Sequence, residues 1–326
     1  MSMRRIDRAV ADYTALRPSL LPATDEFVEH VTGIIDDAGI NYLSVTGRTK
    51  AIGSFAGKAR AVHAVDATAD PLHAVTDQVG VRVITYVQRD IDAVAGLLAE
   101  KFTVLGDRDL GEETAAAGRF GYASRHLLVS RAAGDPTAYE PLFCASIQLR
   151  TVLQHAWAEF EHDIRYKGTV PPEQVPDLDR RFTLAAGLLE LADREFGAIR
   201  DRLQAGLGDR SVDPGDAHDP RISAPELATF LAGRYSSAGW SRTEHYEWIS
   251  GLLLELGIAS LDELSATLRD VDSSAVTAAM GYRYPPGAVR RLDDDLLSRF
   301  GDTYVGLHGN AHRREALEAR RSHLPD

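Results

Sequence analysis

The segment 145–166, ASIQLRTVLQHAWAEFEHDIRY, changes its periodicity at Thr151 and so restricts the folds open to this chain. Up to residue 150, apolar and polar residues alternate, and the polar positions are Ser146, Gln148 and Arg150. Strict alternation predicts a strand with one face in the core and one polar face. From Thr151 to residue 166 the apolar spacing is helical, so we expect a strand that runs directly into a helix.

Strand and helix patterns also alternate in the preceding part of the chain. The run 79–87, VGVRVITYV, is dense in β-branched residues and predicts a central strand. Thr24 is expected to cap one helix and Asp90 another. The segments expected to be helical are 5–18, 24–38, 48–64, 90–101, 151–166 and 176–205. The other expected strands are 42–46, 102–105, 126–130 and 142–150, with a loop over 106–121. This pattern predicts an α+β fold in which helices flank a mixed sheet of about five strands.

The rest of the chain reads as helical. Residues 208–220, GDRSVDPGDAHDP, lack hydrophobic periodicity and predict a linker. Beyond them, three serines are each followed three positions later by a glutamate, the spacing of a capping box. These pairs are Ser223 with Glu226, Ser241 with Glu244, and Ser260 with Glu263. We therefore expect one domain over 1–207, a linker over 208–220 and a small all-helical domain over 221–326.

Composition limits the classes of protein and partner. The chain has 326 residues, of which 44% are hydrophobic and 26% charged, the mix of a globular protein. No apolar run approaches the ~18 residues that span a bilayer, and no signal peptide is evident. The only cysteine, Cys144, excludes an intrachain disulfide and fits a cytoplasmic protein, in which we expect this thiol to lie in the core. The formal net charge of −12 argues against nucleic-acid binding through bulk electrostatics.

A cluster of basic residues lies in segment 47–60, GRTKAIGSFAGKAR. Read as a helix, this segment places Lys50, Ser54 and Lys58 on one face, with Arg48 at the entrance. Such a set of donors beside a helix N-terminus is suited to a polyphosphate. The alternative is a basic face exposed to solvent, and the segment alone does not decide between the two.

Asp77 directly precedes the strand expected over residues 79–87, where a carboxylate can hold Mg²⁺ at the edge of a sheet. Mg²⁺ takes one or two carboxylates together with phosphate oxygens and water. Arg82 lies inside the same apolar run, and a buried guanidinium needs a partner. Either these residues contact a ligand, or they pair with each other for structural reasons.

Segment 120–126, FGYASRH, carries a second group of polar residues. Tyr122 follows a glycine that permits a turn, and it can stack on a base or serve only as a turn aromatic. Ser124 and His126 can bind phosphate or ribose. Taken alone, this motif is weak evidence.

The helix expected after the strand carries His155, Glu159 and His162 on one face. Such a face can hold a metal. We favour a polar seam where the helix docks on the sheet beside a ligand, and we expect Trp157 to lie in the core.

Four segments, in this order and at this spacing, resemble the (p)ppGpp synthetase domain of RelA/SpoT-like proteins, of the small alarmone synthetase type. They are GRTKAIGSFAGK at 47–58, DQVGVRV at 77–83, GYASRH at 121–126 and SIQLRTVLQHAWAEFEHDIRYK at 146–167. The resemblance spans residues 20–200 and does not reach the helical region beyond residue 220. It implies a nucleotidyltransferase-like fold, a mixed sheet flanked by helices.

The resemblance also implies a reaction, in which a pyrophosphate passes from ATP to the 3′-hydroxyl of GDP or GTP. The products are AMP and the stringent-response alarmone ppGpp or pppGpp. On this basis the residues expected to contact ATP are Arg48, Lys50, Ser54, Lys58 and Arg82, and Asp77 is expected to carry Mg²⁺. Those expected to contact the acceptor nucleotide are Tyr122, Ser124, His126, Arg150 and Lys167. Asp77, Gln148 and the residue at position 146 are the expected catalytic set.

Position 146 departs from the family pattern, which reads Glu-x-Gln-x-Arg-Thr at this strand. The glutamate there helps to hold the metal and activates the acceptor hydroxyl, whereas Ser146 is neutral and cannot act as a base unaided. The chain is therefore a slow or altered synthetase in which another acid such as Glu140 substitutes, an inactive nucleotide-binding regulator, or a toxin-type enzyme that pyrophosphorylates another acceptor such as the tRNA 3′ end. The first reading is favoured, because the donor-side residues are intact.

The C-terminal region carries locally basic residues, which are Arg290, Arg291, His312, Arg313, Arg314, Arg320 and Arg321. Asp293–Asp295 and Glu315 interrupt them, so we expect ordinary solvated helix faces. The role of this region stays open between homo-oligomerisation, internal inhibition and partner binding.

Overall fold

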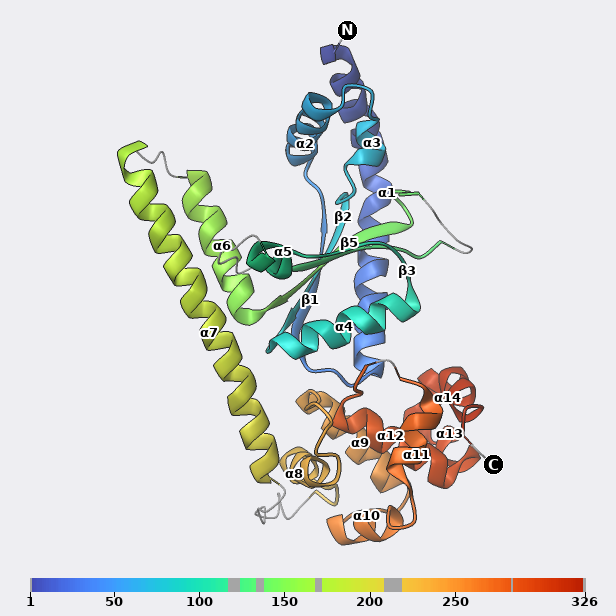
Figure 1. Ribbon diagram of the computed structural model, residues 1–326. Coiled ribbons are helices and arrows are strands. Elements are labelled where there is room, and N and C mark those ends of the chain that lie inside the picture. Colours follow the sequence, from blue (N-terminus) through green and yellow to red (C-terminus); the bar gives the residue numbers. More distant parts are fainter. Residues whose placement is uncertain are drawn as a thin grey trace. The chain divides into compact units, whose positions relative to one another are not determined.

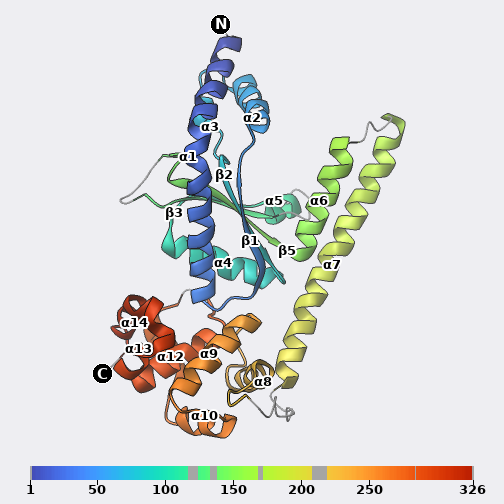
Figure 2. The same cartoon turned by 180° about the vertical axis from the view of Figure 1, so that it is seen from behind.

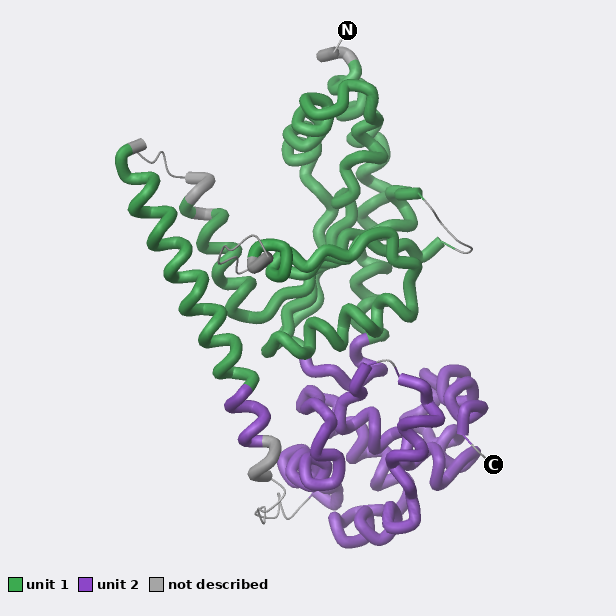
Figure 3. Tube along the Cα trace, in the orientation of Figure 1, with its two compact units in different colours: residues 1–34, 42–197 green, residues 35–41, 198–326 purple. Residues whose placement is uncertain are grey.

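The computed structural model describes residues 2–116, 124–132, 138–167, 172–207, 219–282 and 284–324. The chain forms two compact units (Figure 3). The first comprises Met1–Ile34 and Tyr42–Gly197, and the second comprises Ile35–Asn41 and Ala198–Asp326. The second unit thus takes in the end of the long helix that the sequence assigns to the first domain, and a short segment near the N-terminus. Most of the expected linker, 208–218, lies outside the described residues.

The first unit contains a mixed sheet of five strands, as predicted. The strands are β1 (Tyr42–Thr49), β2 (Val79–Thr85), β3 (Thr103–Asp109), β4 (Arg125–Ser130) and β5 (Cys144–Thr151). Their order across the sheet is β1-β2-β5-β4-β3. Only the central pair, β2 and β5, is parallel, and the other three neighbouring pairs are antiparallel. The strand that carries Ser146 therefore lies at the centre of the sheet.

Helices flank this sheet (Figures 1 and 2). They are α1 (Ser2–Asp37), α2 (Ile52–Val65), α3 (Pro71–Ala74), α4 (Gln88–Lys101), α5 (Leu110–Ala116), α6 (Val152–Lys167) and α7 (Val175–Leu207), with a short 3-10 turn at Pro172–Gln174. Both views show the sheet between α1 and the paired helices α6 and α7. Trp157 of α6 contacts Phe182 of α7 at a ring-centroid distance of 5.6 Å, which confirms its place in a small core between these helices.

The two predicted N-terminal helices are one continuous helix, α1, so the interruption expected between residues 18 and 24 is wrong. Thr24 does not cap a helix; its hydroxyl donates to the carbonyl of Leu20 one turn earlier. Pro18 and Pro22 lie inside α1, four residues apart, so the backbone donors they lack fall on the same side of the helix. The N-terminal half packs on α2, where Tyr13 stacks on Phe55, and the C-terminal half packs on the sheet at Gly47, so tertiary contacts override the local signal.

Two other expectations were wrong in their boundaries. The segment expected to be a helix over 48–64 is divided, because β1 continues to Thr49 and α2 begins only at Ile52. The loop expected over 106–121 contains the end of β3 and the helix α5, and residues 117–123 lie outside the described part. The α4 helix is confirmed, but Asp90 lies in its first turn and Val87 is its N-cap.

The sheet has one apolar and one polar face. Along β5, the buried residues Ala145, Ile147 and Leu149 alternate with the partly exposed Ser146, Gln148 and Arg150, as predicted. Gly47 is in register with Val81, which is in register with Ile147, so these three share the apolar face. A side chain at Gly47 would lie 2.6 Å from Val28 and 2.7 Å from Thr24, so α1 packs closely on that face. The opposite face is left to polar residues.

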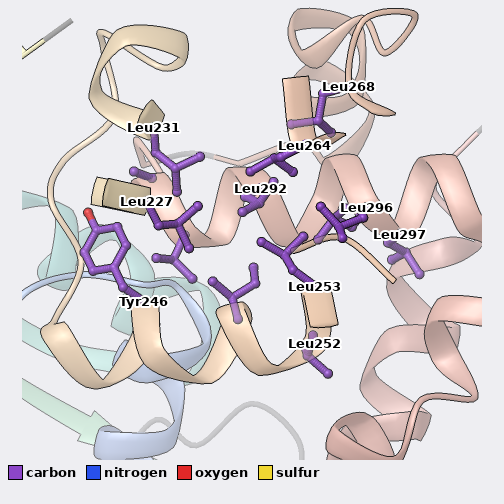
Figure 4. Packing of buried hydrophobic residues seen from close by; sticks show 14 of the residues in the cluster. Leu227, Leu231, Tyr246, Leu252, Leu253, Leu264, Leu268, Leu292, Leu296 and Leu297 are labelled. Atoms are coloured by element: carbon purple, nitrogen blue, oxygen red, sulfur yellow. The ribbon is translucent and has the colours of Figure 1, made fainter. Parts of the chain in front are cut away.

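The second unit is all-helical. Its helices are α8 (Ala224–Arg234), α9 (Thr243–Glu255), α10 (Leu261–Thr267), α11 (Ser273–Met280), α12 (Ala288–Phe300), α13 (Asp302–Val305) and α14 (Arg314–Arg321), with a 3-10 helix at His308–Arg313. Leucines from α8, α9, α10 and α12 form one apolar core (Figure 4). The capping box at Ser223 and Glu226 is confirmed, and Ser260 accepts from the backbone of Glu263. The box at Ser241 is wrong, because Ser241 Oγ donates to Gly39 O instead.

The C-terminal basic residues are not all on solvated faces, which corrects the sequence reading. Asp293 is 1% exposed and accepts hydrogen bonds from Arg313, Arg320 and Tyr304. Arg320 also bonds Asp294. Asp293 and Asp294 are therefore largely buried ion-pair partners of Arg313 and Arg320.

No helix in the described part of the chain combines the length and the apolar character that a membrane crossing requires.

Candidate active site

Two lysines of the expected ATP-binding segment meet at Asp77. Lys50 Nζ and Lys58 Nζ each donate to Oδ2 of Asp77 at 2.7 Å. Lys50 is 3% exposed and Lys58 is 56% exposed, so Lys58 keeps much of its surface available to a ligand. We call these three residues the Asp77 cluster. The alternative in which Asp77 and Arg82 pair with each other does not hold.

The loop that carries Lys50 is fixed from two sides. Tyr13 Oη and Arg17 Nε of α1 both donate to the carbonyl of Lys50, at 2.6 and 3.1 Å. The Lys50 amide donates to the carbonyl of Gln78 at 2.9 Å, which ties the loop to the residue after Asp77. Sequence reasoning missed Tyr13, Arg17 and Gln78, because nothing local to α1 indicates that its side chains reach a loop more than thirty residues away.

Burial and charge act in opposite directions on this cluster. Burial lowers the pKa of Lys50, and hydrogen bonding to Asp77 opposes that effect without cancelling it. Burial raises the pKa of Asp77, but the hydrogen bonds from Lys50 and Lys58 outweigh it, so the net pKa lies below the ordinary value. Asp77 is therefore ionised at neutral pH and available to a cation.

The prediction that one helix face brings Lys50, Ser54 and Lys58 together was wrong. Lys50 precedes α2 and does not share a helix face with Ser54 and Lys58. Ser54 and Arg48 are both exposed, Ser54 in the first turn of α2 and Arg48 on β1. The basic segment thus reaches the site from a strand, a loop and a helix in turn.

Strand register places most other predicted residues on one face of the sheet, because directly paired residues point to the same side. Arg48 of β1 pairs with Gly80 of β2, and Gly80 pairs with Ser146 of β5. Since Gly80 has no side chain, the face is open between Arg48 and Ser146.

A second row of paired residues lies two positions further along β2 and β5, on the same face. Arg82 of β2 pairs with Gln148 of β5, which pairs with His126 of β4. Arg108 of β3 extends this row and was not predicted. We call the surface formed by Arg48, Arg82, Ser146, Gln148, Arg150 and His126 the polar face.

Arg82 forms an ion pair with a residue of α6. Its Nη1 lies 3.1 Å from Oε1 of Glu159, and His155 Nδ1 lies 3.8 Å from the same carboxylate oxygen. Within the described residues, no group of three or more histidines, cysteines, aspartates and glutamates is arranged to hold a metal. The contacts of Glu159 with Arg82 and His155 agree with the polar seam expected beside the site.

Arg150 is a cation without a hydrogen-bonded acid among the described residues. Its Nε is buried and has no hydrogen-bond partner there. Burial lowers the pKa of Arg150, and the nearby Arg82 lowers it further, while Glu159 raises it. A buried guanidinium donor without an acceptor is suited to a bound anion.

Ser124 and His126 contact each other directly. Ser124 Oγ lies 2.7 Å from His126 Nε2, and Ser124 is 6% exposed. Burial lowers the pKa of His126, and Arg150, Arg108 and Lys58 lower it further. Since Lys58 also bonds Asp77, the residues expected to contact ATP and those expected to contact the acceptor belong to one electrostatic environment.

Two predicted residues cannot be placed. Tyr122 lies outside the described residues, and Lys167 ends α6 but its side chain is not among those described.

The Asp77 cluster satisfies one requirement of the expected Mg²⁺ ion. Asp77 Oδ1 is buried and has no hydrogen-bond partner among the described residues, while Oδ2 takes both lysines. One carboxylate oxygen without a partner among the described residues, beside two lysines, fits an ion that completes its shell with phosphate and water.

A mixed sheet with a cationic polar face, and beside it a carboxylate bound by two lysines, is compatible with a pyrophosphotransferase, the class to which the following similarities assign the chain. Residues 47–170 match the family described as the region found in RelA / SpoT proteins. The chain is 32% identical over 167 residues to the GTP pyrophosphokinase YjbM of Bacillus subtilis, covering 49% of this chain and 72% of that protein. The chain belongs to the RelA/SpoT family.

Solved structures resemble the same part of the chain. The small alarmone synthetase 1 of Bacillus subtilis bound to its product pppGpp is 25% identical, with a TM-score of 0.48, and covers 59% of this chain and 98% of that chain. A GTP pyrophosphokinase family protein from Streptococcus pneumoniae is 25% identical, with a TM-score of 0.48, and covers 60% of this chain and 96% of that chain.

Proposed function

We propose that this protein transfers a pyrophosphate from ATP to the 3′-hydroxyl of GDP or GTP and so makes (p)ppGpp. The observation that carries the proposal is the Asp77 cluster, in which Lys50 and Lys58 hold one carboxylate oxygen and leave the other without a partner among the described residues. The two lysines can bind the triphosphate while the aspartate binds its divalent ion, so the cluster suits the pair better than the lysines or the aspartate would alone. The relative from Bacillus subtilis is named a GTP pyrophosphokinase, which supports the same reaction.

In this proposal the residues divide between two substrates. Lys50, Lys58, Arg48, Ser54 and Arg82 neutralise and orient the ATP phosphates, and Asp77 would hold Mg²⁺, which supplies further charge neutralisation at the phosphates when bound. Phosphoryl-type transfer depends mainly on in-line placement and on neutralised phosphate charge, and requires no covalent intermediate. The polar face would then position the acceptor.

On the acceptor side, Arg150 offers a buried donor to a phosphate, and Gln148 lies between Arg82 and His126 in strand register. Tyr122 would stack on the guanine, and Lys167 would approach the acceptor phosphates. The protein would act in the cytoplasm on free nucleotides. The net charge of −12 disfavours a tRNA acceptor.

Ser146 favours one competing function, a nucleotide-binding regulator without turnover. A hydroxyl gives the acceptor no base, and loss of one general base costs about 10²–10⁴-fold in rate. A slow enzyme and an inactive regulator therefore differ only in the size of the residual turnover rate.

Incubation with Mg²⁺, radiolabelled ATP and separate acceptors (GDP, GTP, ATP, tRNA) tests the proposal. We expect AMP and a 3′-labelled guanine nucleotide, and loss of both in Asp77→Asn. Lys58→Met should weaken ATP binding, whereas Lys101→Met, at the exposed end of α4, is a matched control that should not. ATP binding without any product, in wild type and in Ser146→Glu alike, would establish the regulator instead.

A further inference from the structure

The polar face lacks an available carboxylate at the position of Ser146, which raises the question of what removes the acceptor proton. The neighbouring carboxylates each have a cationic partner, and the remaining oxygen of Asp77 is the one expected to carry the metal. Asp77 accepts from Lys50 and Lys58, and Glu159 pairs with Arg82. Glu140 is exposed in the turn before β5.

His126 is the titratable side chain that strand register places beside Ser146. In the antiparallel pair of β4 and β5, Leu128 is opposite Ser146, and His126 is opposite Gln148. His126 is therefore a diagonal neighbour of Ser146 on the same face. Diagonal neighbours are about 7–8 Å apart between Cα atoms, within reach of a long or aromatic side chain. The residue directly opposite His126 is Gln148, so a hydroxyl bound between Ser146 and Gln148 lies beside this imidazole.

The hydrogen bond of His126 prepares the ring to accept a proton. Ser124 Oγ contacts Nε2, and Nδ1 has no hydrogen-bond partner among the described residues. A serine hydroxyl can donate or accept a hydrogen bond, so this contact holds the ring of neutral His126 in place. In the tautomer in which Nε2–H donates to Ser124, Nδ1 carries the lone pair and can take a proton.

The charges around His126 keep it neutral. The groups acting on it are Arg150 of β5, Arg108 of β3, Lys58 of α2 and Asp77, and Glu113 of α5 is the partner of Arg108. Burial is the largest influence and lowers its pKa, the three cations lower it further, and Asp77 opposes them. The imidazole is thus unprotonated at pH 7.

We infer that His126 replaces the missing glutamate as general base, taking the proton of the acceptor 3′-hydroxyl. This inference rests on the proposed function. The hydroxyl O–H bond breaks and its proton passes to His126; the oxygen forms a bond to the β-phosphorus of ATP. The bond from that phosphorus to the α–β bridging oxygen breaks, AMP leaves with the electron pair, and the imidazolium releases its proton to solvent.

A double-mutant cycle separates a base from a residue that only binds phosphate. The variants are His126→Gln, Ser146→Glu and the double variant, assayed for kcat with ATP and GDP. We expect His126→Gln to lower kcat by about 10²–10³-fold in the wild-type background and by less than about tenfold in the Ser146→Glu background, where a carboxylate is available. Equal losses in both backgrounds would overturn the inference.

The pH dependence gives a second readout. In wild type, kcat/KM should fall as pH decreases through the lowered pKa of His126, below ~6.5. In the double variant this limb should move toward the carboxylate range, near ~4.3. His73→Gln, a histidine on α3 that pairs with Asp70, serves as the matched control and should leave the wild-type profile unchanged. An unchanged profile in the double variant would contradict the inference, whereas a lack of product in wild type and Ser146→Glu alike refutes the proposed function itself.

Discussion

Removing the carboxylate of Asp293 should strongly lower the free energy of unfolding of the second unit. Asp293 is 1% exposed and accepts from Arg313 at 2.6 and 2.8 Å, from Arg320 at 2.7 Å and from Tyr304 at 2.5 Å. Both arginines are themselves largely buried, with 10% and 13% of their side chains exposed. Asp293→Asn keeps the volume but leaves Arg313 without its carboxylate, and breaking a buried pair in this way costs about 3–5 kcal/mol.

Fluorescence can report this unit selectively. Of the three tryptophans, Trp240 and Trp248 belong to the second unit, and Arg313 lies over the Trp248 ring at 4.3 Å. In a Trp157→Phe background, urea unfolding followed by tryptophan emission therefore reports this unit. Labelling of Cys144, which is fully buried and is the only thiol, reports the first unit separately.

The control is Asp302→Asn. Asp302 forms an ion pair with Arg321, and the side chain of Asp302 is 85% exposed. Solvated pairs contribute about 0–1 kcal/mol, so this variant should unfold nearly as wild type does. A loss below about 1 kcal/mol for Asp293→Asn, or losses of equal size in the two variants, would refute the argument that burial makes this network essential.

The lowered pKa of Asp293 predicts how the stability of the second unit changes at acidic pH. Burial raises the pKa of Asp293, but Arg320 and Arg313 outweigh that effect and hold the pKa well below its ordinary value. A depressed folded-state pKa contributes stability above the unfolded-state value, near ~3.9, and this stability is lost as pH falls below it. The stability difference between wild type and Asp293→Asn should therefore be constant near neutral pH and should shrink below about pH 4.

Two further changes probe packing and the donor site. Gly287→Ala should destabilise the second unit by about 1–3 kcal/mol, because the new Cβ would lie 2.0 Å from the carbonyl oxygen of Gly39. Gly251→Ala, inside α9 with no atom within 4 Å of the added Cβ, should instead stabilise it by about 0.5–1 kcal/mol; urea unfolding measures both. Lys50→Met should weaken ATP binding by about tenfold or more in calorimetry, since Asp77 and the phosphates lose a charged donor.

Periodicity was sufficient to predict the five strands and the polar side of β5. The alternation at Ser146, Gln148 and Arg150 depends only on the two-residue repeat of a strand, so it survives folding unchanged. The start of α2 was missed because Ala51 at its N-cap provides no side-chain hydrogen bond. The Lys50 loop is nevertheless held in place, because Tyr13 Oη donates to the Lys50 carbonyl and the Lys50 amide donates to the Gln78 carbonyl. The sequence carries no signal for contacts to backbone atoms.

The buried charges of the second unit show a different limit. Asp293 meets Arg313 and Arg320 from twenty and twenty-seven residues away. Helical spacing relates residues three or four apart, so no periodic signal connects partners separated by a turn and another helix. Each of these residues, taken locally, resembled a solvated surface charge.

Under the proposed function, a serine at position 146 has consequences for binding as well as for rate. The described residues near the donor site include Lys50, Lys58 and Arg48 as cations, against the single carboxylate of Asp77. A glutamate at position 146 would add a second negative charge beside bound phosphates, which the serine avoids. Where no divalent ion offsets that charge, a serine should therefore favour phosphate binding at neutral pH while slowing proton removal, and a neutral histidine on the neighbouring strand would recover part of that rate without adding negative charge. The same residue that argues against fast turnover thus argues for a site that holds its nucleotides tightly.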